Sequence, residues 1–303
     1  MTTLVESARA VADVKYRGLI AALVALALSF GCRGGANNFL TDLDEARRLA
    51  SDLRVQFNKA VDASNRAVMA DTDEASARFA RDAEATKRSV ESDLSKLSAV
   101  LGRLGYPAEI RSIDEFRRHF AEYDKVDRAM LALAVENTNL EAQRLFAGPG
   151  REAADGFRAA LESVPATVAP KDRCRVGALV ATAVVAVREL QVLQGPHIAE
   201  SNDAAMTSLE KQMADSEASA RAALKELGGI VEVGPGSPFA TASAALDRFS
   251  GINAEIVKLS RRNTNVRSLD LALRAKPPLT HACDDGSRAL IDALAKVGSK
   301  ATR

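Results

Sequence analysis

The chain has 303 residues, of which 47% are hydrophobic and 4% aromatic, with 41 basic and 40 acidic side chains and no tryptophan. Its charges are mixed along the chain, and no like-charge block or basic stripe with aromatics occurs, so we expect no nucleic-acid partner. Abundant Ala, Leu, Val, Glu and Arg, without period-two strand patterns, predict an all-α protein with room for two domains.

The N-terminal segment has the pattern of an export or anchoring signal. Residues 1–17 end in Lys15 and Arg17, and an uncharged apolar run follows from Gly18 to Gly31. This run is shorter than the roughly 20 residues of a spanning helix and suits the core of a signal peptide. Residues 1–32 are therefore predicted to be a signal peptide or short membrane anchor, with the body periplasmic or otherwise outside the cytoplasm.

Cys32 directly follows this apolar run. The stretch "LSFGC" resembles a bacterial lipobox, in which a Cys after a small residue is lipidated. Gly31 fits that pattern, whereas Ser29 stands where the pattern has Leu. A lipid on Cys32, a short uncleaved anchor and cleavage without an anchor all stay open. In the first two cases residues 18–32 tether the body to the membrane of a bacterial cell envelope.

Gly and Pro divide the rest of the chain into helical runs of about 15–35 residues. We predict four helices in a first copy, at 40–69, 73–104, 111–146 and 150–165, and four in a second, at 172–195, 203–228, 238–274 and 281–299. "ADTD" and "ESND" supply N-cap residues for the second helix of each copy. The expected domains are two tandem up-down-up-down four-helix bundles, residues 37–166 and 171–300.

The two copies are related by an offset of 126 residues in their third helices and 130 elsewhere. Apolar residues spaced by threes and fours form the seam of the first of these helices. Most of these positions are apolar again 126 residues later. The offset changes only in loops, which is typical of a duplication. The first seam is Ile113, Phe116, Phe120, Tyr123, Val126, Met130, Leu133, Asn137 and Leu140, and the second runs from Phe239 to Val266.

The triplet Asn-Thr-Asn lies in both of these seams, beginning at Asn137 and at Asn263. A buried Asn in a helical seam lowers stability but specifies register and pairing. Alternatively, Asn137, Asn139, Asn263 and Asn265 line a polar pocket that binds a small organic ion. Both interpretations stay open.

The order of these helices, with "ADTDEA", "DLSKL", "EFRRHFAEYDKVDRAMLALAVENTNLEAQRLF" and "FRAALESV", resembles the four-helix-bundle ligand-binding module of bacterial chemoreceptors. The resemblance covers about residues 40–165 and, more weakly, 172–299. It implies a sensor-like module for a small ligand or a signalling partner. We expect no output domain in this chain. The alternative is a structural or interaction protein of the envelope.

No catalytic or cofactor motif occurs in the sequence. The Ser-His-Asp order, Gly-rich phosphate loops and His-Glu-x-x-His are absent, and no Cys/His spacing fits zinc or haem. We therefore expect no enzyme, metal or cofactor. His119, His197 and His281 are expected to be capping or solvated residues. The expected partners are the membrane, a small ligand or envelope protein, and a second copy of the chain.

Two features concern buried positions in the second copy. The run "VGALVATAVVAV", residues 176–187, is too short to span a bilayer and is expected to be a fully buried helix. Cys174 and Cys283 begin antiparallel helices of this copy, so their Cα atoms should lie roughly 30 Å apart. A disulfide needs them within about 7 Å, and we therefore predict no bridge between them.

Overall fold

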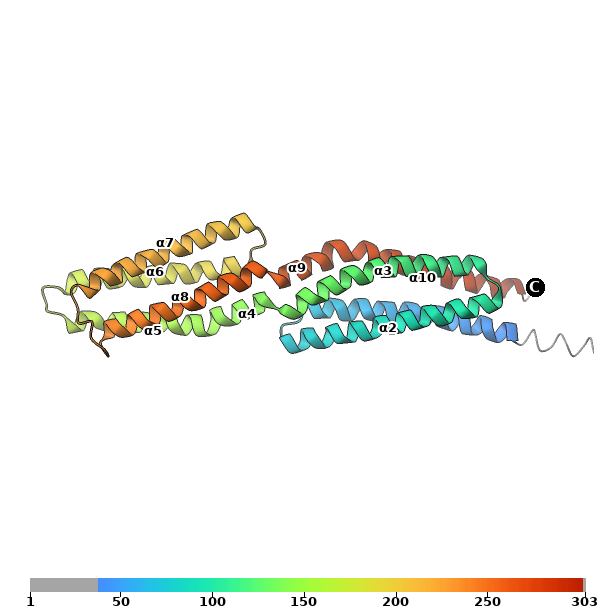
Figure 1. Cartoon of the computed structure of the whole chain (residues 1–303), viewed down its shortest axis with the longest axis horizontal. Helices are drawn as coiled ribbons and strands as arrows, with labels where there is room; N and C mark the ends of the chain where they lie inside the picture. The colour runs from blue at the N-terminus through green and yellow to red at the C-terminus, as the bar shows by residue number, and fades with distance from the viewer. Residues whose placement is uncertain (1–37, 302–303) are drawn as a thin grey trace, which may run out of the picture. The chain divides into compact units, whose positions relative to one another are not determined.

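The computed structural model describes residues 38–301. The predicted signal or anchor segment, with the lipidation candidate Cys32, lies outside them. The described residues are almost entirely helical and contain no strand, which confirms the all-α class (Figure 1). The α-helices are residues 38–68, α2 (Asp73–Leu104), α3 (Pro107–Glu136), α4 (Thr138–Leu145), α5 (Arg151–Ser163), α6 (Arg173–Ala199), α7 (Asp203–Gly228), α8 (Pro238–Arg262), α9 (Thr264–Asp270) and α10 (Lys276–Ala301).

The predicted N-caps of the second helix in each copy are present. Thr72 Oγ1 accepts a hydrogen bond from the backbone N–H of Ala75 (3.2 Å) at the start of α2. At the start of α7, Asn202 Oδ1 accepts from two backbone N–H groups at 3.0 Å each. These bonds satisfy amides that have no partner inside the helix, so both helices begin where the sequence indicates.

The two longest predicted helices are each interrupted inside their Asn-Thr-Asn triplet. Asn137 has φ 50° and Asn263 has φ 54°, the left-handed region that ends a right-handed helix. Asn tolerates this conformation better than other residues with a Cβ. The predicted helices 111–146 and 238–274 are therefore split, into α3 with α4 and into α8 with α9.

Two predicted breaks were wrong, the one between helices 111–146 and 150–165 at Gly148-Pro149-Gly150 and the one between helices 238–274 and 281–299 at Pro277-Pro278. The end predicted for helix 172–195, at Gly195-Pro196, was also wrong. A π-helical turn, Phe146–Gly150, joins α4 to α5 without reversing the chain. A second π-helical turn, Leu271–Ala275, joins α9 to α10 at the equivalent place in copy two. α6 likewise continues through Pro196 to Ala199. A π-turn changes the local hydrogen-bond ladder, so a proline at such a site need not end the helix.

Contacts divide the described chain into two compact units that cut across the sequence repeat. Unit 1 contains residues 38–60, 84–122 and 279–301, and unit 2 contains Val61–Ala83 and Tyr123–Pro278. The expected domains, 37–166 and 171–300, describe the two copies but not these units. Because α4 continues through the π-helical turn into α5 without a reversal, the fourth helix of copy one packs against α6 and α8 of copy two. α10 correspondingly joins helices of copy one in unit 1.

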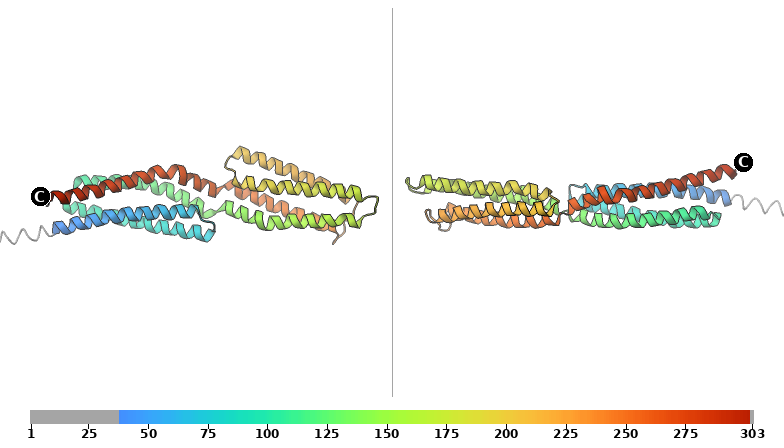
Figure 2. Two further views of the ribbon diagram at one scale, coloured as in Figure 1. Left: turned by 180° about the vertical axis from the view of Figure 1, so that it is seen from behind. Right: turned by 90° about the horizontal axis from the view of Figure 1, so that it is seen from above.

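Unit 1 is a four-helix bundle with an aromatic centre. The Phe57 ring meets Phe116 edge-on at 6.0 Å between centroids, and Phe116 stacks on Phe120 at 6.1 Å. α10 runs antiparallel to the first helix, because Arg47 Nε bonds Leu294 O (3.2 Å) and Arg54 bonds Asp284 (2.8 Å). Residues 38 and 301 therefore lie at the same end of this unit (Figures 1 and 2).

Unit 2 holds its main core between α5, α6, α7 and α8. Fully buried side chains such as Phe157, Leu190, Leu227 and Phe249 come from all four helices. A smaller core lies where the ends of the first helix, α2 and α3 meet, and includes Ala67, Ala83, Met130, Leu131 and Ala134. The Asn-Thr-Asn triplets belong to the same unit.

The prediction that residues 176–187 are fully buried was wrong. Among the described residues, α6 is the one helix long and apolar enough to cross a membrane, a test that core helices of soluble proteins also pass. Only 33% of its most apolar stretch is buried, and Val185 is 54% and Val192 64% exposed. Sequence periodicity could not show this, because residues 176–187 carry apolar or small side chains on nearly every face of the helix.

Candidate functional site at the Asn-Thr-Asn junction

The two Asn-Thr-Asn triplets lie against each other, with their threonines in direct contact. The backbone N–H of Thr138 donates to Thr264 Oγ1 (3.1 Å), and that of Thr264 donates to Thr138 Oγ1 (3.2 Å). The two hydroxyl oxygens are themselves 3.1 Å apart. Since residues 126 apart exchange identical bonds, the contact has a local twofold relationship. We call this contact region, residues 137–139 and 263–265, the junction.

The asparagines of the junction extend this reciprocal pattern. The backbone N–H of Asn139 donates to Asn265 Oδ1 (3.1 Å), and that of Asn265 donates to Asn139 Oδ1 (3.2 Å). Asn139 Nδ2 donates to Asn263 Oδ1 and Asn265 Nδ2 to Asn137 Oδ1, both at 2.9 Å. All four predicted ligand-binding residues are therefore brought together, with their amides bonded to one another.

The junction is also hydrogen-bonded to the last turn of α6 and to the segment between α6 and α7. Asn139 Nδ2 donates to Ile198 O (2.7 Å), and Asn263 Nδ2 donates to Glu200 O (2.8 Å). Asn137 Nδ2 is buried and has no hydrogen-bond partner among the described residues. The local twofold is therefore imperfect, because Asn263 makes a backbone bond that Asn137 lacks, and Asn139 makes one for which no equivalent is seen at Asn265 in the described part of the chain.

An open cleft of about 610 Å³ adjoins the copy-two side of the junction. Asn263 is in its wall, and the guanidinium-bearing residues Arg267 and Arg274 border it. Arg274 pairs with Asp270 at 2.9 Å. Apolar side chains form much of the remaining wall: Leu133, Val266, Leu269, Leu271 and Leu273. Such a lining suits a small molecule that carries both an anionic group and an apolar part.

His197 was expected to cap a helix or face solvent, and this prediction was wrong. Its side chain is fully buried inside α6, with Nδ1 2.8 Å from Ser260 Oγ and Nε2 2.9 Å from Glu210 Oε1. Arg261 binds the same carboxylate at 2.5 and 2.8 Å. The Arg261 hydrogen bond, and then that of His197, lowers the pKa of Glu210 below its ordinary value.

This Ser-His-Glu row is structural rather than catalytic in its geometry. Ser260 is fully buried on α8, and its Oγ lies 2.5 Å from Ile256 O, one turn earlier in the helix. A nucleophilic serine needs an approach for substrate next to its oxygen. Sequence reasoning missed this row because the three residues come from three different helices.

A second buried polar group that sequence reasoning missed lies around Lys276. Its ammonium is 2.9 Å from Asp127 Oδ1 and 3.2 Å from Asn65 Oδ1, and it lies 5.4 Å from the centre of the Tyr123 ring. Lys276 is 2% and Asp127 0% exposed. Copy two has Phe249 and Asn253 at the positions of Tyr123 and Asp127, and Asn253 bonds Gln194 (2.9 Å). The pair thus combines a carboxylate of copy one with an ammonium of copy two, and the position equivalent to Asp127 carries no charge in copy two.

The remaining candidate residues form no shared site. His119 is half-exposed beside Glu115, at 4.0 Å. Cys174 is exposed in unit 2, and Cys283 is buried in unit 1; both are free thiols, as predicted. The reason differs from the predicted one, because the fourth helix of copy two belongs to the other unit. Within the described residues, no group of three or more His, Cys, Asp or Glu is placed to hold a metal ion.

Comparison with models of protein families and with curated proteins finds no match to this chain.

Proposed function

We propose that the chain is a sensor-like binding module of the bacterial cell envelope, held to the membrane by its N-terminal segment, and that it binds a small organic anion beside the junction. The observation that carries this proposal is the cleft of about 610 Å³ that includes Asn263 in its wall. Its size lies within the range of small-molecule sites in proteins. The resemblance to chemoreceptor ligand-binding modules points in the same direction.

The chemistry of the cleft favours a carboxylate with an apolar body. Arg267 is exposed and makes no ion pair with any described residue, so its guanidinium is available for a bidentate contact. Leu269 and Leu273 are 42% and 68% exposed, and a ligand that covered them would remove apolar surface from water. Both contributions act on one molecule only if it carries both kinds of group.

A ligand in this cleft would contact residues that lead directly into α10 and residues bonded to the turn before α7. The cleft wall includes α9 and the π-helical turn Leu271–Ala275, from which α10 continues. π-turns are frequent at functional sites, where a small change in the hydrogen-bond ladder shifts the following helix. Asn263 adds a second route, since its side chain bonds the turn before α7. Ligand binding would thus act on two helices from one place.

A thermal-shift screen of small carboxylates on the full chain in detergent tests this proposal. We expect at least one aliphatic or aromatic carboxylate to raise the midpoint of unfolding of the wild type. Arg267→Ala should abolish that shift, whereas Arg248→Ala, an exposed arginine of α8 that lines no part of the cleft, should preserve it. Equal shifts in both variants would place binding elsewhere and contradict the proposal.

The second candidate function is a structural or interaction protein of the envelope. It is favoured by the junction itself, because protein partners occupy nearly all of the hydrogen-bonding groups of its four asparagines. Affinity capture from membranes separates the two functions. A receptor or kinase partner favours sensing, whereas envelope scaffold proteins in the absence of any ligand-induced thermal shift favour the structural role.

Membrane attachment has its own test. If Cys32 carries a lipid, Cys32→Ser should move the protein from the membrane fraction to the soluble fraction, because the acyl chains that enter the bilayer are lost. Continued attachment of the Cys32→Ser chain would leave the uncleaved apolar segment as the anchor. Release of the wild type itself would contradict the tethered form of the proposal.

A further inference from the structure

One face of α6 is exposed although small and apolar side chains form most of it. Val185 and Val192 lie on this face with Ala178 and Ala199, and all four are exposed. Arg188 and Glu189 are the charged residues at its middle. Arg188 bonds only Gln191, at 3.4 Å, among the described residues. An isolated exposed valine needs no explanation, but a whole apolar helix face does.

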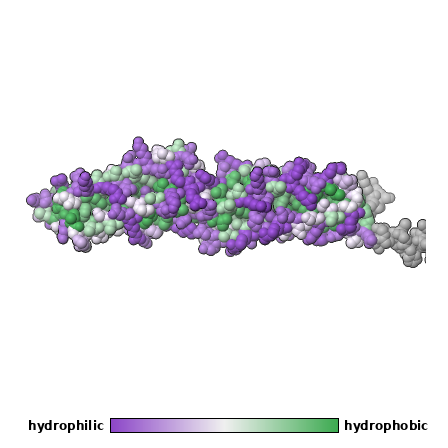
Figure 3. Space-filling view, in the orientation of Figure 1, coloured by the Kyte–Doolittle hydropathy of each residue, from purple (hydrophilic) through white to green (hydrophobic). Residues whose placement is uncertain are grey.

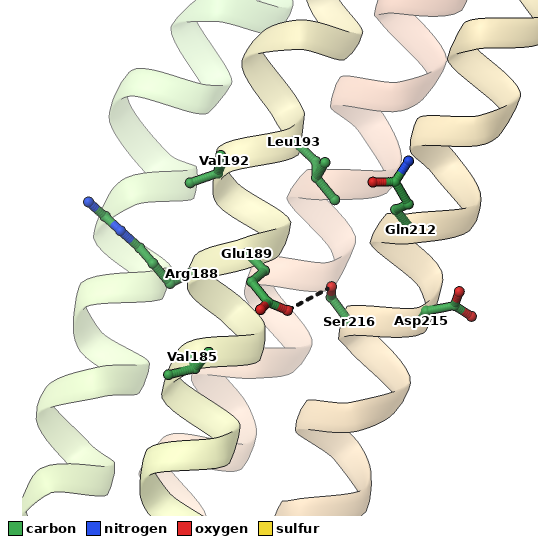
Figure 4. Close-up of a pocket in the computed structure, with 8 residues that line it drawn as sticks. All are labelled: Val185, Arg188, Glu189, Val192, Leu193, Gln212, Asp215 and Ser216. Carbon is green, nitrogen blue, oxygen red and sulfur yellow. Dashed lines mark hydrogen bonds between the residues drawn. The ribbon is translucent and has the colours of Figure 1, made fainter.

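A groove of about 520 Å³ runs along the same face, between α6 and α7. Val185, Val192 and Leu193 contribute its apolar wall, and Gln212 and Ser216 of α7 form the opposite wall. Figure 4 shows Val185, Arg188 and Val192 projecting from one side of α6, while Glu189 reaches across to Ser216 (3.5 Å). In the space-filling view, hydrophobic residues reach the surface between hydrophilic ones (Figure 3).

The exposed face of α6 is complementary to itself in the antiparallel direction. In an antiparallel helix pair, residues that face each other have position numbers with a constant sum. When Arg188 faces Glu189 of another α6, Val185 faces Val192 and Ala178 faces Ala199. Each of these pairs occurs twice about a twofold axis, as in any isologous interface. Charge therefore meets opposite charge, valine meets valine and alanine meets alanine.

We propose that this face binds a second copy of the chain, with the two α6 helices antiparallel and each entering the groove between α6 and α7 of its partner. Charge complementarity selects this occupant, because the Arg188 and Glu189 pair satisfies itself across the axis. A lipid surface is a poorer occupant, since both charges would enter the apolar layer. The alanines allow the two backbones to approach closely, as small residues do at helix contacts.

The area of this face limits the strength of the dimer. From Ala178 to Ala199 α6 rises about 32 Å, and a strip about 10 Å wide gives about 300 Å² per copy. This is below the roughly 800 Å² per partner of a stable interface, so the groove wall on α7 must contribute. We therefore expect a weak dimer, with a dissociation constant in the micromolar range or above.

Disulfide cross-linking of the purified chains in detergent solution tests the antiparallel register. One tagged full-length chain carries Val185→Cys, and a second chain with a different tag carries Val192→Cys. Cys32 and Cys174 are replaced by Ser in both chains. Mild oxidation should give a mixed dimer with both tags as the main product. Disulfides between two chains that carry the same tag should be minor, because identical positions of the two helices lie about 10 Å apart along the axis. Val233→Cys, at an equally exposed valine (55%), replaces Val185→Cys in the matched control and should give none.

Charge reversal provides the second measurement. Arg188→Glu or Glu189→Arg alone should weaken self-association about tenfold, the worth of two exposed ion pairs turned repulsive. The chain carrying both changes should regain wild-type association, because the reversed pair again satisfies itself. Weak self-association of the double variant would overturn the proposal. Cross-linking from Val233→Cys as strong as from Val185→Cys, or a Cys174–Cys174 disulfide in the wild type, would overturn it as well.

Discussion

Thr138 and Thr264 each bind the backbone amide of the other through their side-chain hydroxyl. Each hydroxyl accepts the amide N–H of the other residue, at 3.1 and 3.2 Å, and both residues are buried. Both amides are buried and have no access to water. The first residue of α4 and the first residue of α9 therefore each depend on a hydroxyl group 126 residues away. Residues 126 apart in the sequence thus bind each other, and this contact lies where the two long helices are interrupted.

Replacing Thr138 by Val should destabilise the protein by about 1–3 kcal/mol, because a buried N–H loses its acceptor. Thr138→Ser keeps the hydroxyl and should cost much less. Thr264→Val should have a similar effect, since its geometry is nearly the same. Urea unfolding of the four proteins measures these differences. A Val variant as stable as the Ser variant would mean that the hydroxyl pair does not stabilise the junction.

The imperfect twofold predicts unequal effects at Asn137 and Asn263. Both residues are left-handed and both accept one side-chain bond, so Ala costs both about the same in backbone strain. Asn263 additionally donates to Glu200 O. Asn263→Ala should therefore destabilise by about 1 kcal/mol more than Asn137→Ala. Gly at either position should recover the strain but not the lost bonds. Thermal unfolding with equal losses at both positions would contradict this difference.

Lys276 provides the largest expected effect on stability. Lys276→Met leaves the fully buried Asp127 carboxylate without its cation, which should cost about 3–5 kcal/mol. Adding Asp127→Asn to the same chain should recover a large part of the loss, since no buried charge is then left alone. Arg274→Met, which breaks an exposed pair with Asp270, is the control and should cost less than about 1 kcal/mol. An additive double variant would show that the pair is not coupled.

Glu210 should make stability depend on acid pH. Its pKa is lowered in the folded state, mainly by the Arg261 hydrogen bond and then by His197, so folding is favoured while the carboxylate is ionised. This contribution is complete above the ordinary glutamate value of 4.5 and is lost as the pH falls through the lower folded pKa. Glu210→Gln should therefore destabilise at pH 7 and much less in strong acid.

Unfolding measured across this range, with Glu122→Gln as the control for removing one exposed carboxylate, tests the prediction. A Glu210→Gln loss that is the same at pH 7 and in acid would show that the loss comes from packing and not from the charge.

The helical class and the repeat could be predicted from sequence because they depend on local spacing. The packing of the fourth helix of each copy against helices of the other copy could not be predicted. Gly148-Pro149-Gly150 has the composition of a turn, and only the π-helical ladder, formed in three dimensions, lets the chain continue straight into α5. Since a straight connection and a reversal differ in a few backbone angles, helical periodicity on either side is the same in both cases.

The junction shows the same limit at the level of a site. The repeated triplet identified the four asparagines as one group, and the structure brings them together. The sequence could not identify Ile198 O or Glu200 O as partners, because a backbone carbonyl is present at every residue. Lys276 was hidden for a related reason, since a lysine beside two prolines normally indicates an exposed loop. Its partners Asp127 and Asn65 are distant in the chain.

The two described cysteines should differ sharply in reactivity. Cys174 is exposed near the start of α6, whereas Cys283 is fully buried in α10, and burial raises the pKa of the Cys283 thiol to about 12. A thiolate is the reacting species, so at pH 8 a disulfide reagent should label Cys174 within minutes and Cys283 only after unfolding. In a chain whose Cys32 is replaced by Ser, Cys174→Ser should remove the fast phase and leave the slow one. Fast labelling of Cys283 in the folded protein would show that α10 opens locally in unit 1, and a 174–283 disulfide in the intact mass would contradict the division of the chain into these two units.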